Sequence, residues 1–307
     1  MEIRRIASLA VSAIGLGCNN FGSRLDYART EAVVHSALDS GITFLDTADI
    51  YGGTRSEEFL GRALARRRDT VVLATKFGMP VDDQRKGAAP AYVAQALEDS
   101  LRRLDTDRID LYQLHQPDPA TPIADTLGAL NDLVRAGKIR EIGCSNFSAS
   151  QIEEASAAVA AGSAHFVSVQ NEYSMLHRAP ERDVLGTCER LGMAFLPYFP
   201  LASGLLTGKY VRGVAPPAGS RLSAAAAASR FLTDERLQVV EALTRFAESR
   251  GHSLLELAVS WLLHRQVVAS VIAGATSPEQ VQDNVHAASW RLTAADLAEI
   301  DRIAPLA

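Results

Sequence analysis

The sequence has few cysteines, and none of them are paired at the spacing of a metal or redox motif. Its three cysteines, Cys18, Cys144 and Cys188, lie far apart in a chain of 307 residues. A disulfide framework is therefore not expected, and reduced thiols are typical of an intracellular compartment. We expect a cytoplasmic protein.

A long apolar run is also missing. Residues 1–18 are mildly apolar, but Arg4, Arg5, Gly15 and Gly17 interrupt them. A membrane helix needs about 20 predominantly apolar residues, and a signal peptide needs a continuous apolar core. We expect neither of them, and no membrane partner.

The chain shows no sign of a basic surface either. Its formal net charge is −5, and the only run of three basic residues is Arg66-Arg67-Arg68. This run closes a predicted helix, where positive charge complements the helix dipole. General affinity for nucleic acid is therefore not expected.

The composition, by contrast, provides for a large core, with 47% apolar and 22% charged residues. The length permits one large α/β domain or two small ones. Because no domain linker or low-complexity segment interrupts the chain, we expect one domain over residues 1–307. No exposed apolar stripe stands out, so a monomer is the default expectation.

Short apolar segments alternate with longer amphipathic ones along the chain. The predicted strands end near Leu16, Asp46, Thr75, His115, Ser145, Gln170, Tyr198 and Gly274. Helices are predicted over residues 30–39, 57–67, 90–104, 122–135, 150–161, 180–190 and 234–249. This alternation predicts a (β/α)8 barrel. A doubly wound open sheet is the alternative, although residues 15–20 lack the third glycine of its nucleotide-binding turn.

Two features go beyond a bare barrel. Residues 199–230 form a long connection after the seventh strand, with glycines, the pair Pro216-Pro217 and an alanine run. Such a connection inside a compact domain is usually functional or mobile. Two more helices are predicted after the eighth strand, over residues 277–288 and 293–303.

Reactive side chains stand where three predicted strands end. Asp46, Lys76 and His115 close successive strands, and Tyr51 follows the first of them on a loop. A parallel barrel brings such positions together at one end, where its active site lies. Each residue alone also fits a structural role, but the set indicates an enzyme.

These four side chains suggest acid–base chemistry on a carbonyl group. A buried lysine must be paired, and Asp46 is the natural partner of Lys76. The lysine charge is expected to lower the pKa of Tyr51 from about 10 and make it a usable proton donor. His115 would orient the same substrate oxygen. No metal set and no serine or cysteine nucleophile emerges, so reduction would need a hydride donor.

Six segments then resemble the aldo-keto reductase family, in the same order and over nearly the whole chain. They are residues 11–17 (VSAIGLG), 44–52 (FLDTADIYG), 74–78 (ATKFG), 110–115 (DLYQLH), 137–147 (GKIREIGCSNF) and 197–210 (PYFPLASGLLTGKY). The resemblance implies a barrel with an N-terminal hairpin and an NAD(P)H-dependent reduction of aldehydes or ketones. It also implies that Tyr51 is the proton donor, tuned by Lys76 and Asp46, with His115 orienting the carbonyl.

The resemblance further implies a nicotinamide cofactor site across the strand ends and the long connection. Tyr198 would stack on the nicotinamide, and the long connection would cover the pyrophosphate. At the adenosine end, Ser277, Pro278 and Gln280 predict a capped helix start, which suits a phosphate. The residues assigned to the cofactor are Ser145, Asn146, Gln170, Tyr198, Leu201, Gly204, Lys209, Gly274, Thr276, Gln280 and Asn284.

The chain departs from the family pattern at two places in this site. Many members that prefer NADPH place a basic residue near the adenosine 2′-phosphate, and this chain has Gly274, Thr276, Ser277 and Gln280 there. An arginine of the long connection could compensate, so NADPH is preferred and NADH use stays open. The candidates for this are Arg212, Arg221 and Arg230. The second departure is Phe199, where serine is common.

The substrate is expected to be a small, partly polar carbonyl compound. Loops after the first three strands would line its pocket with Asn19, Asn20, Phe21, Ile50, Phe77 and Met79. Two other functions are compatible with the sequence. One is a non-catalytic cofactor sensor or regulatory subunit, as in potassium-channel β subunits. The other is an isomerase or aldolase that forms a Schiff base on Lys76.

Overall fold

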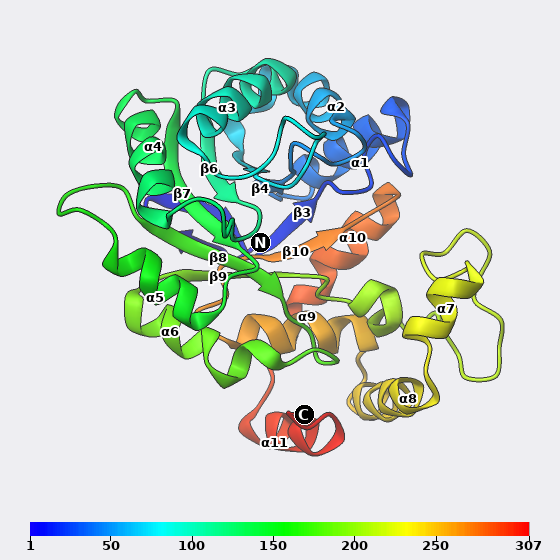
Figure 1. Ribbon diagram of the computed structural model, residues 1–307. Helices are drawn as coiled ribbons and strands as arrows, with labels where there is room; N and C mark the ends of the chain where they lie inside the picture. The colour runs from blue at the N-terminus through cyan, green and yellow to red at the C-terminus, as the bar shows by residue number, and fades with distance from the viewer. Residues whose placement is uncertain (307) are drawn as a thin grey trace.

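Eight parallel strands form the centre of the protein in a computed structural model that describes residues 1–306 (Figure 1). The strands follow the order β10-β3-β4-β5-β6-β7-β8-β9, and a bridge between Phe195 and Val268 joins the two ends of the sheet. This closure confirms the predicted (β/α)8 barrel and excludes the open sheet. The strands are β3 Ile14–Gly17, β4 Phe44–Asp46, β5 Val72–Phe77, β6 Ile109–Leu114, β7 Ile139–Ser145, β8 Phe166–Glu172, β9 Ala194–Tyr198 and β10 Val271–Gly274.

Helices surround this barrel in the order that the alternation predicts. They are α1 Tyr27–Asp39, α2 Arg55–Leu64, α3 Pro90–Leu104, α4 Ile123–Arg135, α5 Ala149–Ala157, α6 Val184–Leu191, α7 Ala225–Phe231, α8 Asp234–Glu248, α9 Leu254–His264, α10 Pro278–His286 and α11 Ala294–Ile303. The 3-10 helices are η1 Ala65–Thr70, η2 Ala179–Arg182, η3 Ala202–Thr207 and η4 Ala287–Ser289. The two helices expected after the eighth strand correspond to α10 and α11.

Strands β5 and β6 show why the apolar runs of this chain form a parallel sheet. Every residue of both strands is buried. A barrel strand faces the interior on one side and the helix layer on the other, so a continuous apolar run is stable there.

The expected N-terminal hairpin is present and covers one end of the barrel. Strands β1 (Ile3–Ile6) and β2 (Leu9–Ser12) pair antiparallel. Ile6, Leu9 and Val11 pack in one cluster with inward-facing residues of the barrel strands, such as Phe44. This end of the barrel is therefore closed by apolar contacts.

Helix α9 was missed by the sequence analysis, which expected only residues 234–249 between the seventh and eighth strands. It packs against β10 and α8, and eight of its eleven residues are buried. A helix that is apolar all round shows no amphipathic period, which explains the omission. The available signal was the capping box of Ser253 and Glu256, whose side chains and backbone amides bond reciprocally.

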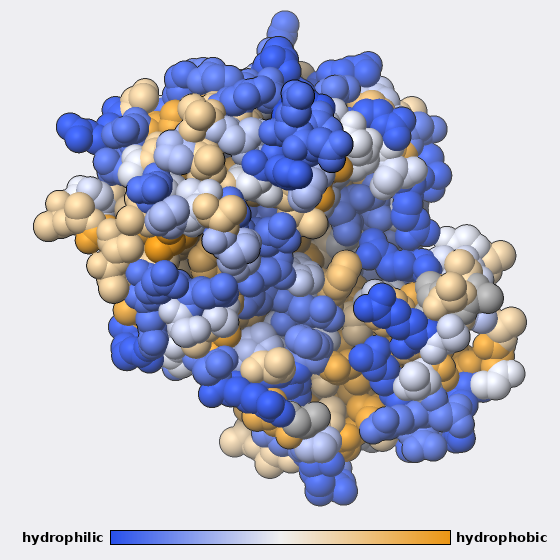
Figure 2. All heavy atoms as spheres, viewed as in Figure 1, coloured by the Kyte–Doolittle hydropathy of each residue, from blue (hydrophilic) through white to orange (hydrophobic). Residues whose placement is uncertain are grey.

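The long connection after β9 is partly helical. It begins with η3, includes α7, and ends at Thr233, the N-cap of α8. In Figure 1, α7 and its flanking loops stand out beside the barrel, next to α8. The face shown in Figure 2 is mostly hydrophilic, with hydrophobic residues scattered among hydrophilic ones. Among the described residues, no helix has the length and apolar character needed to cross a membrane.

Candidate active site

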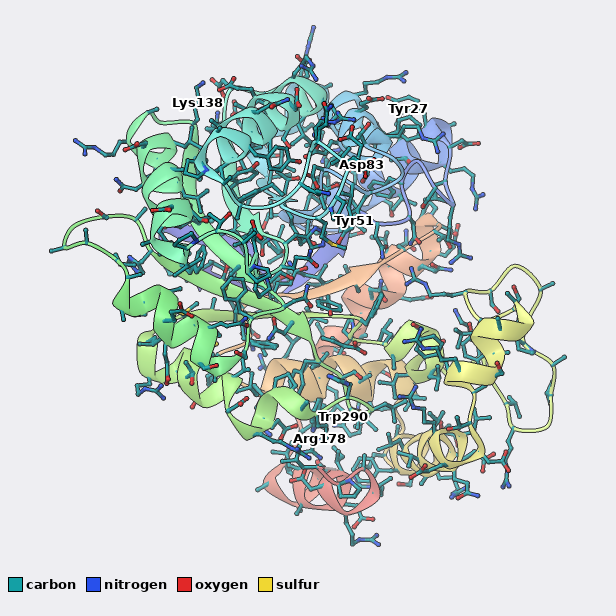
Figure 3. All side chains as sticks on the ribbon, viewed as in Figure 1. Tyr27, Tyr51, Asp83, Lys138, Arg178 and Trp290 are labelled. Atoms are coloured by element: carbon teal, nitrogen blue, oxygen red, sulfur yellow. The ribbon has the colours of Figure 1, made fainter. Side chains whose placement is uncertain are left out.

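The four predicted reactive residues meet at the C-terminal end of the strands. Strand register places Asp46 opposite Ala74 of β5 and Lys76 opposite Gln113 of β6, so their side chains come from neighbouring strands. A cavity of about 580 Å³ opens here, and Asp46, Tyr51 and His115 line it. Figure 3 shows Tyr51 near the centre of the molecule, on the loop between β4 and α2.

Asp46 and Lys76 form a buried ion pair below the cavity. The Lys76 Nζ donates to Asp46 Oδ2 at 2.6 Å and to the Thr47 carbonyl at 2.9 Å. Asp46 Oδ1 accepts from the amides of Gln113 at 3.1 Å and Gln170 at 2.9 Å. Burial alone would lower the pKa of Lys76, but the charge of Asp46, together with the hydrogen bonds to Asp46 and Tyr51, outweighs it and raises that pKa.

This pair argues against a Schiff base on Lys76. The lysine is fully buried, does not line the cavity, and donates to two acceptors. A raised pKa keeps the amine protonated, whereas a Schiff-base lysine must reach its substrate as a free amine.

Tyr51 lies beside Lys76, but its acidity differs from the prediction. The Nζ of Lys76 is 5.2 Å from the centroid of the Tyr51 ring. Burial raises the pKa of Tyr51 more than the Lys76 charge lowers it, and Asp46 raises it further. The expected lowering of this pKa was therefore wrong as a net effect, because desolvation of the phenolate was not counted. The hydroxyl group consequently stays protonated at neutral pH.

His115 faces Tyr51 at the edge of the cavity. The two rings are perpendicular, with centroids 5.8 Å apart. Burial and then the Lys76 charge lower the pKa of His115 to about 3. Its Nδ1 has no hydrogen-bond partner among the described residues. The imidazole is therefore neutral at physiological pH and can donate a hydrogen bond without carrying charge.

Polar side chains from β7, β8 and β9 line the wall beside this centre. Asn146 donates to the His115 carbonyl at 2.9 Å and accepts from the Tyr198 hydroxyl at 2.8 Å. Ser145 donates to the backbone carbonyl of Gln170 at 2.7 Å. Asn146 has a φ of 62°, a left-handed conformation that asparagine tolerates better than most residues. All four residues line the cavity, as the sequence analysis expected.

The long connection forms the next wall of the cavity. Leu201, Gly204 and Lys209 line it together with Phe199, whose ring contacts Tyr198 edge to face. Gly204 has a φ of 95°, a backbone conformation that favours glycine, and a Cβ there would lie 2.9 Å from the flexible end of the Lys209 side chain.

Of the three arginines considered as compensation, only Arg221 lines the cavity. Arg212 pairs with Asp234, and Arg230 lies over Phe231. Arg221 donates to Asn20 Oδ1 at 3.2 Å, and burial followed by the charge of Arg24 lowers its pKa.

The far end of the cavity is formed by β10 and the start of α10. Gly274, Thr276, Gln280 and Asn284 line it. Ser277 caps α10 by accepting from the Gln280 amide, as predicted. The reciprocal half of the predicted capping box is absent here, because the Gln280 side chain accepts from Thr276 instead.

The predicted substrate residues are divided between different surroundings. Asn19 and Asn20 line the cavity, but they lie against Gly274 at its far end. Phe21 and Phe77 are fully buried, and Phe77 stacks on Tyr112. Ile50 lines a separate cleft, and Met79 lines neither.

Two residues of the site were missed. Gln113 lies on β6 two positions before His115, which directly follows that strand, so both side chains are expected on the same side; this alternation was the available signal. Arg24 lines the cavity and donates to the Gly219 carbonyl at 2.7 Å, which joins the β3–α1 loop to the long connection. No local pattern marks Arg24, because its partner is 195 residues away.

Comparison with known proteins gives a consistent assignment. The family model described as "Aldo/keto reductase family" matches residues 13–305. A protein of Oryza sativa subsp. japonica named "Probable voltage-gated potassium channel subunit beta" is 36% identical, over 92% of this chain and 88% of its own length. A protein of the same name from Arabidopsis thaliana is 35% identical over the same shares.

Solved structures resemble the whole chain. The glycerol dehydrogenase AKR11B4 from Gluconobacter oxydans superposes with a TM-score of 0.85 at 32% identity, covering 98% of this chain and 94% of its own. The aldo-keto reductase AKR11C1 from Bacillus halodurans, in its holo form, gives a TM-score of 0.84 at 33% identity, covering 100% and 97%.

Proposed function

The chain belongs to the aldo/keto reductase family, and from that premise we propose that it reduces an aldehyde or ketone to the alcohol with NADPH. The observation that supports this most directly is the position of Tyr51, which lines the cavity. The centroid of its ring lies 5.2 Å from the Lys76 ammonium. The phenol is held protonated beside a cation that can stabilise the phenolate left after proton transfer.

When bound, reduced nicotinamide supplies the hydride that attacks the carbonyl carbon. The Tyr51 hydroxyl donates its proton to the carbonyl oxygen, and the Lys76 ammonium stabilises the phenolate that this leaves. Asp46 holds Lys76 in place at 2.6 Å. His115 remains neutral and donates a hydrogen bond that orients the oxygen.

The donor groups along the cavity fit a nicotinamide dinucleotide. The side-chain nitrogen of Gln170 donates to Asp46 and Gln113, which leaves the side-chain oxygen of Gln170 free to accept from a carboxamide. Tyr198 presents an aromatic ring in the wall. Ser145 and Asn146 would complete this nicotinamide end.

The preference for NADPH rests on the cations of the far half of the cavity. Arg24 and Arg221 both line it, and among the described residues neither forms an ion pair with a carboxylate. Two such guanidinium groups favour an anionic ligand. Lys209 adds a third positive charge from the long connection.

A second candidate function is a cofactor-binding regulatory subunit without turnover. The names of the two plant relatives favour it, since both are described as probable potassium-channel β subunits. The complete set of Asp46, Tyr51, Lys76 and His115 favours the enzyme, because a protein that only binds has little need for a proton donor held beside a cation.

Fluorescence titration with NADPH and NADH tests the cofactor assignment. We expect NADPH to bind more tightly than NADH, and R221Q to weaken NADPH more than NADH. R212Q is the matched control, because Arg212 pairs with Asp234 outside the cavity. Equal losses for both cofactors in R221Q would contradict a contact with the 2′-phosphate.

A screen of aldehydes and ketones with NADPH separates the two functions. Oxidation of NADPH that depends on a carbonyl substrate supports the reductase. Tight NADPH binding with no oxidation by any substrate supports the regulatory subunit.

A further inference from the structure

A second group of buried charges lies behind the active site, between strand β5 and helices α2 and α3. Glu57 of α2 is fully buried, and Asp49 of the β4–α2 loop is 1% exposed. Asp49 stands between Asp46 and Tyr51 in the chain. None of the proposed catalytic steps uses it.

The hydrogen-bond donors in this group, Thr75 and Arg103, both donate to Glu57. The Thr75 hydroxyl donates to Glu57 Oε1 at 2.6 Å, and Arg103 Nε donates to Glu57 Oε2 at 2.6 Å. The remaining nearby cation, Lys76, is bound to Asp46. Neither carboxyl oxygen of Asp49 has a hydrogen-bond partner among the described residues.

Two buried carboxyl groups therefore lie near one guanidinium group, and Glu57 alone is bonded to it. An unpaired carboxylate is very unfavourable in such surroundings, and a proton removes its charge. Because Glu57 already holds both Arg103 and Thr75, the proton belongs on Asp49. The hydroxyl group of Tyr112 is also buried without a hydrogen-bond partner among the described residues.

We propose that Asp49 carries a proton at neutral pH and, as a neutral group, positions the loop that holds Tyr51 beside Lys76. The proposal rests on the proposed reductase function for its effect on turnover. The backbone supplies the link, since the Asp49 amide donates to the Lys76 carbonyl at 3.1 Å and the Tyr51 amide to the Ala48 carbonyl at 3.2 Å. Asp49 is thus a positioning residue that acts through Tyr51.

The charged and titratable groups around Asp49 set the pH above which it loses its proton. Burial and then the charge of Glu57 raise the pKa of Asp49 to about 8, against the opposing effects of the Arg103 charge, the Ile50 backbone amide and the Lys76 charge. The charge of Asp49 would in turn raise the pKa values of Tyr92 of α3 and Tyr112 of β6. Above pH 8 the ionised acid repels Glu57, and the loop shifts away from its position against Lys76.

Stability measurements on D49N test the proton without any substrate. The folded protein holds a proton that the unfolded chain releases near pH 4, so the contribution of Asp49 is complete below that pH and lost as pH rises to about 8. We expect D49N, which cannot ionise, to gain Tm relative to wild type progressively from pH 4 to 8 and to level off above it. A Tm difference that does not change with pH would overturn the proposal. The matched control is D83N, at an exposed position on the loop after β5 (Figure 3).

Turnover gives the second readout. We expect kcat of the wild type and of D83N to fall as pH rises through about 8, and that fall to be absent in D49N. Identical alkaline profiles in D49N and wild type would overturn the positioning role. If no variant and no wild-type protein turns over any carbonyl substrate, the proposed function fails while the Tm difference still tests the proton.

Infrared titration of the wild type provides a test that needs no variant. A band of a protonated carboxylic acid is expected at neutral pH and should disappear as pH rises through about 8. Absence of that band at pH 7 would overturn the proposal.

Discussion

The two ends of the barrel are built in opposite ways. At the N-terminal end, the β1–β2 hairpin closes the interior with Leu9 and Val11, which are at most 1% exposed and contact apolar side chains. At the C-terminal end, Asp46, Gln170 and the neutral imidazole of His115 line a cavity of about 580 Å³, and Lys76 and Gln113 bond to Asp46 behind it. The closed end is apolar, and the open end is polar.

The difference shows how stability and chemistry are separated in this protein. Apolar burial gains about 25 cal/mol per Å² and, unlike a hydrogen bond or an ion pair, is non-directional. A buried ion pair contributes little net stability, yet losing one partner leaves an uncompensated charge. Changes at the closed end should therefore affect folding alone, whereas changes at the open end should affect the reaction and sometimes folding as well.

The largest effect is expected for Y51F, which removes the proton donor at the open end. We expect kcat to fall by roughly 100- to 10,000-fold, the usual contribution of a general acid, while NADPH binding and Tm stay close to wild type. Steady-state kinetics and fluorescence titration measure these quantities. Y27F is the matched control, because Tyr27 lies at the periphery in Figure 3.

The K76M substitution at the open end is expected to reduce both stability and turnover. It leaves Asp46 as a buried charge without its cation, so the free energy of unfolding should fall by about 3–5 kcal/mol. Turnover should be lost as well, and denaturant unfolding with kinetics measures the two effects. K138M serves as control at an exposed lysine that pairs with Glu98. A loss of stability as small as that of the control would mean that Asp46 finds another partner.

At the closed end, L9A should weaken folding without touching the reaction. Leu9 is 1% exposed, and truncation of such a leucine lowers the free energy of unfolding by about 2–5 kcal/mol. The values of kcat and KM, measured well below Tm, are expected to stay unchanged. I3A on the same hairpin is the control, since Ile3 is 56% exposed. A changed kcat in L9A would show that the two ends are coupled.

The smallest effect concerns the protonation of His115. Its pKa is lowered to about 3, so its ring proton resonances in NMR should not shift between pH 5 and 8. The unfolded chain binds a proton near pH 6.5 that the folded protein does not, so this residue's contribution to stability is present above that pH and lost as pH falls towards 3. A midpoint near 6.5 in the folded protein would place a charged imidazole at the open end and contradict the neutral hydrogen-bond donor.

Much of this arrangement could be predicted from residue patterns. The barrel, the long connection and the two helices after β10 follow from the alternation of apolar runs and amphipathic segments. Helix α9 could not be found from periodicity, because eight of its eleven residues are buried and its surface has no polar side. The pKa of Tyr51 was predicted in the wrong direction, because a neighbouring charge can be inferred from sequence order but the extent of burial cannot.

The sequence by itself determined which side chains reach the open end of the barrel. Parallel strands bury both faces and turn their C-terminal ends to one side, so the residues that end each strand share one region. Only the tertiary structure decided how those groups pair. Gln170 reaches Asp46 across 124 residues, Arg221 rather than Arg212 or Arg230 lines the cavity, and Glu57 takes the cation that Asp49 lacks. Distances and burial between residues far apart in the chain set these pairings, and they exist only once the barrel is closed.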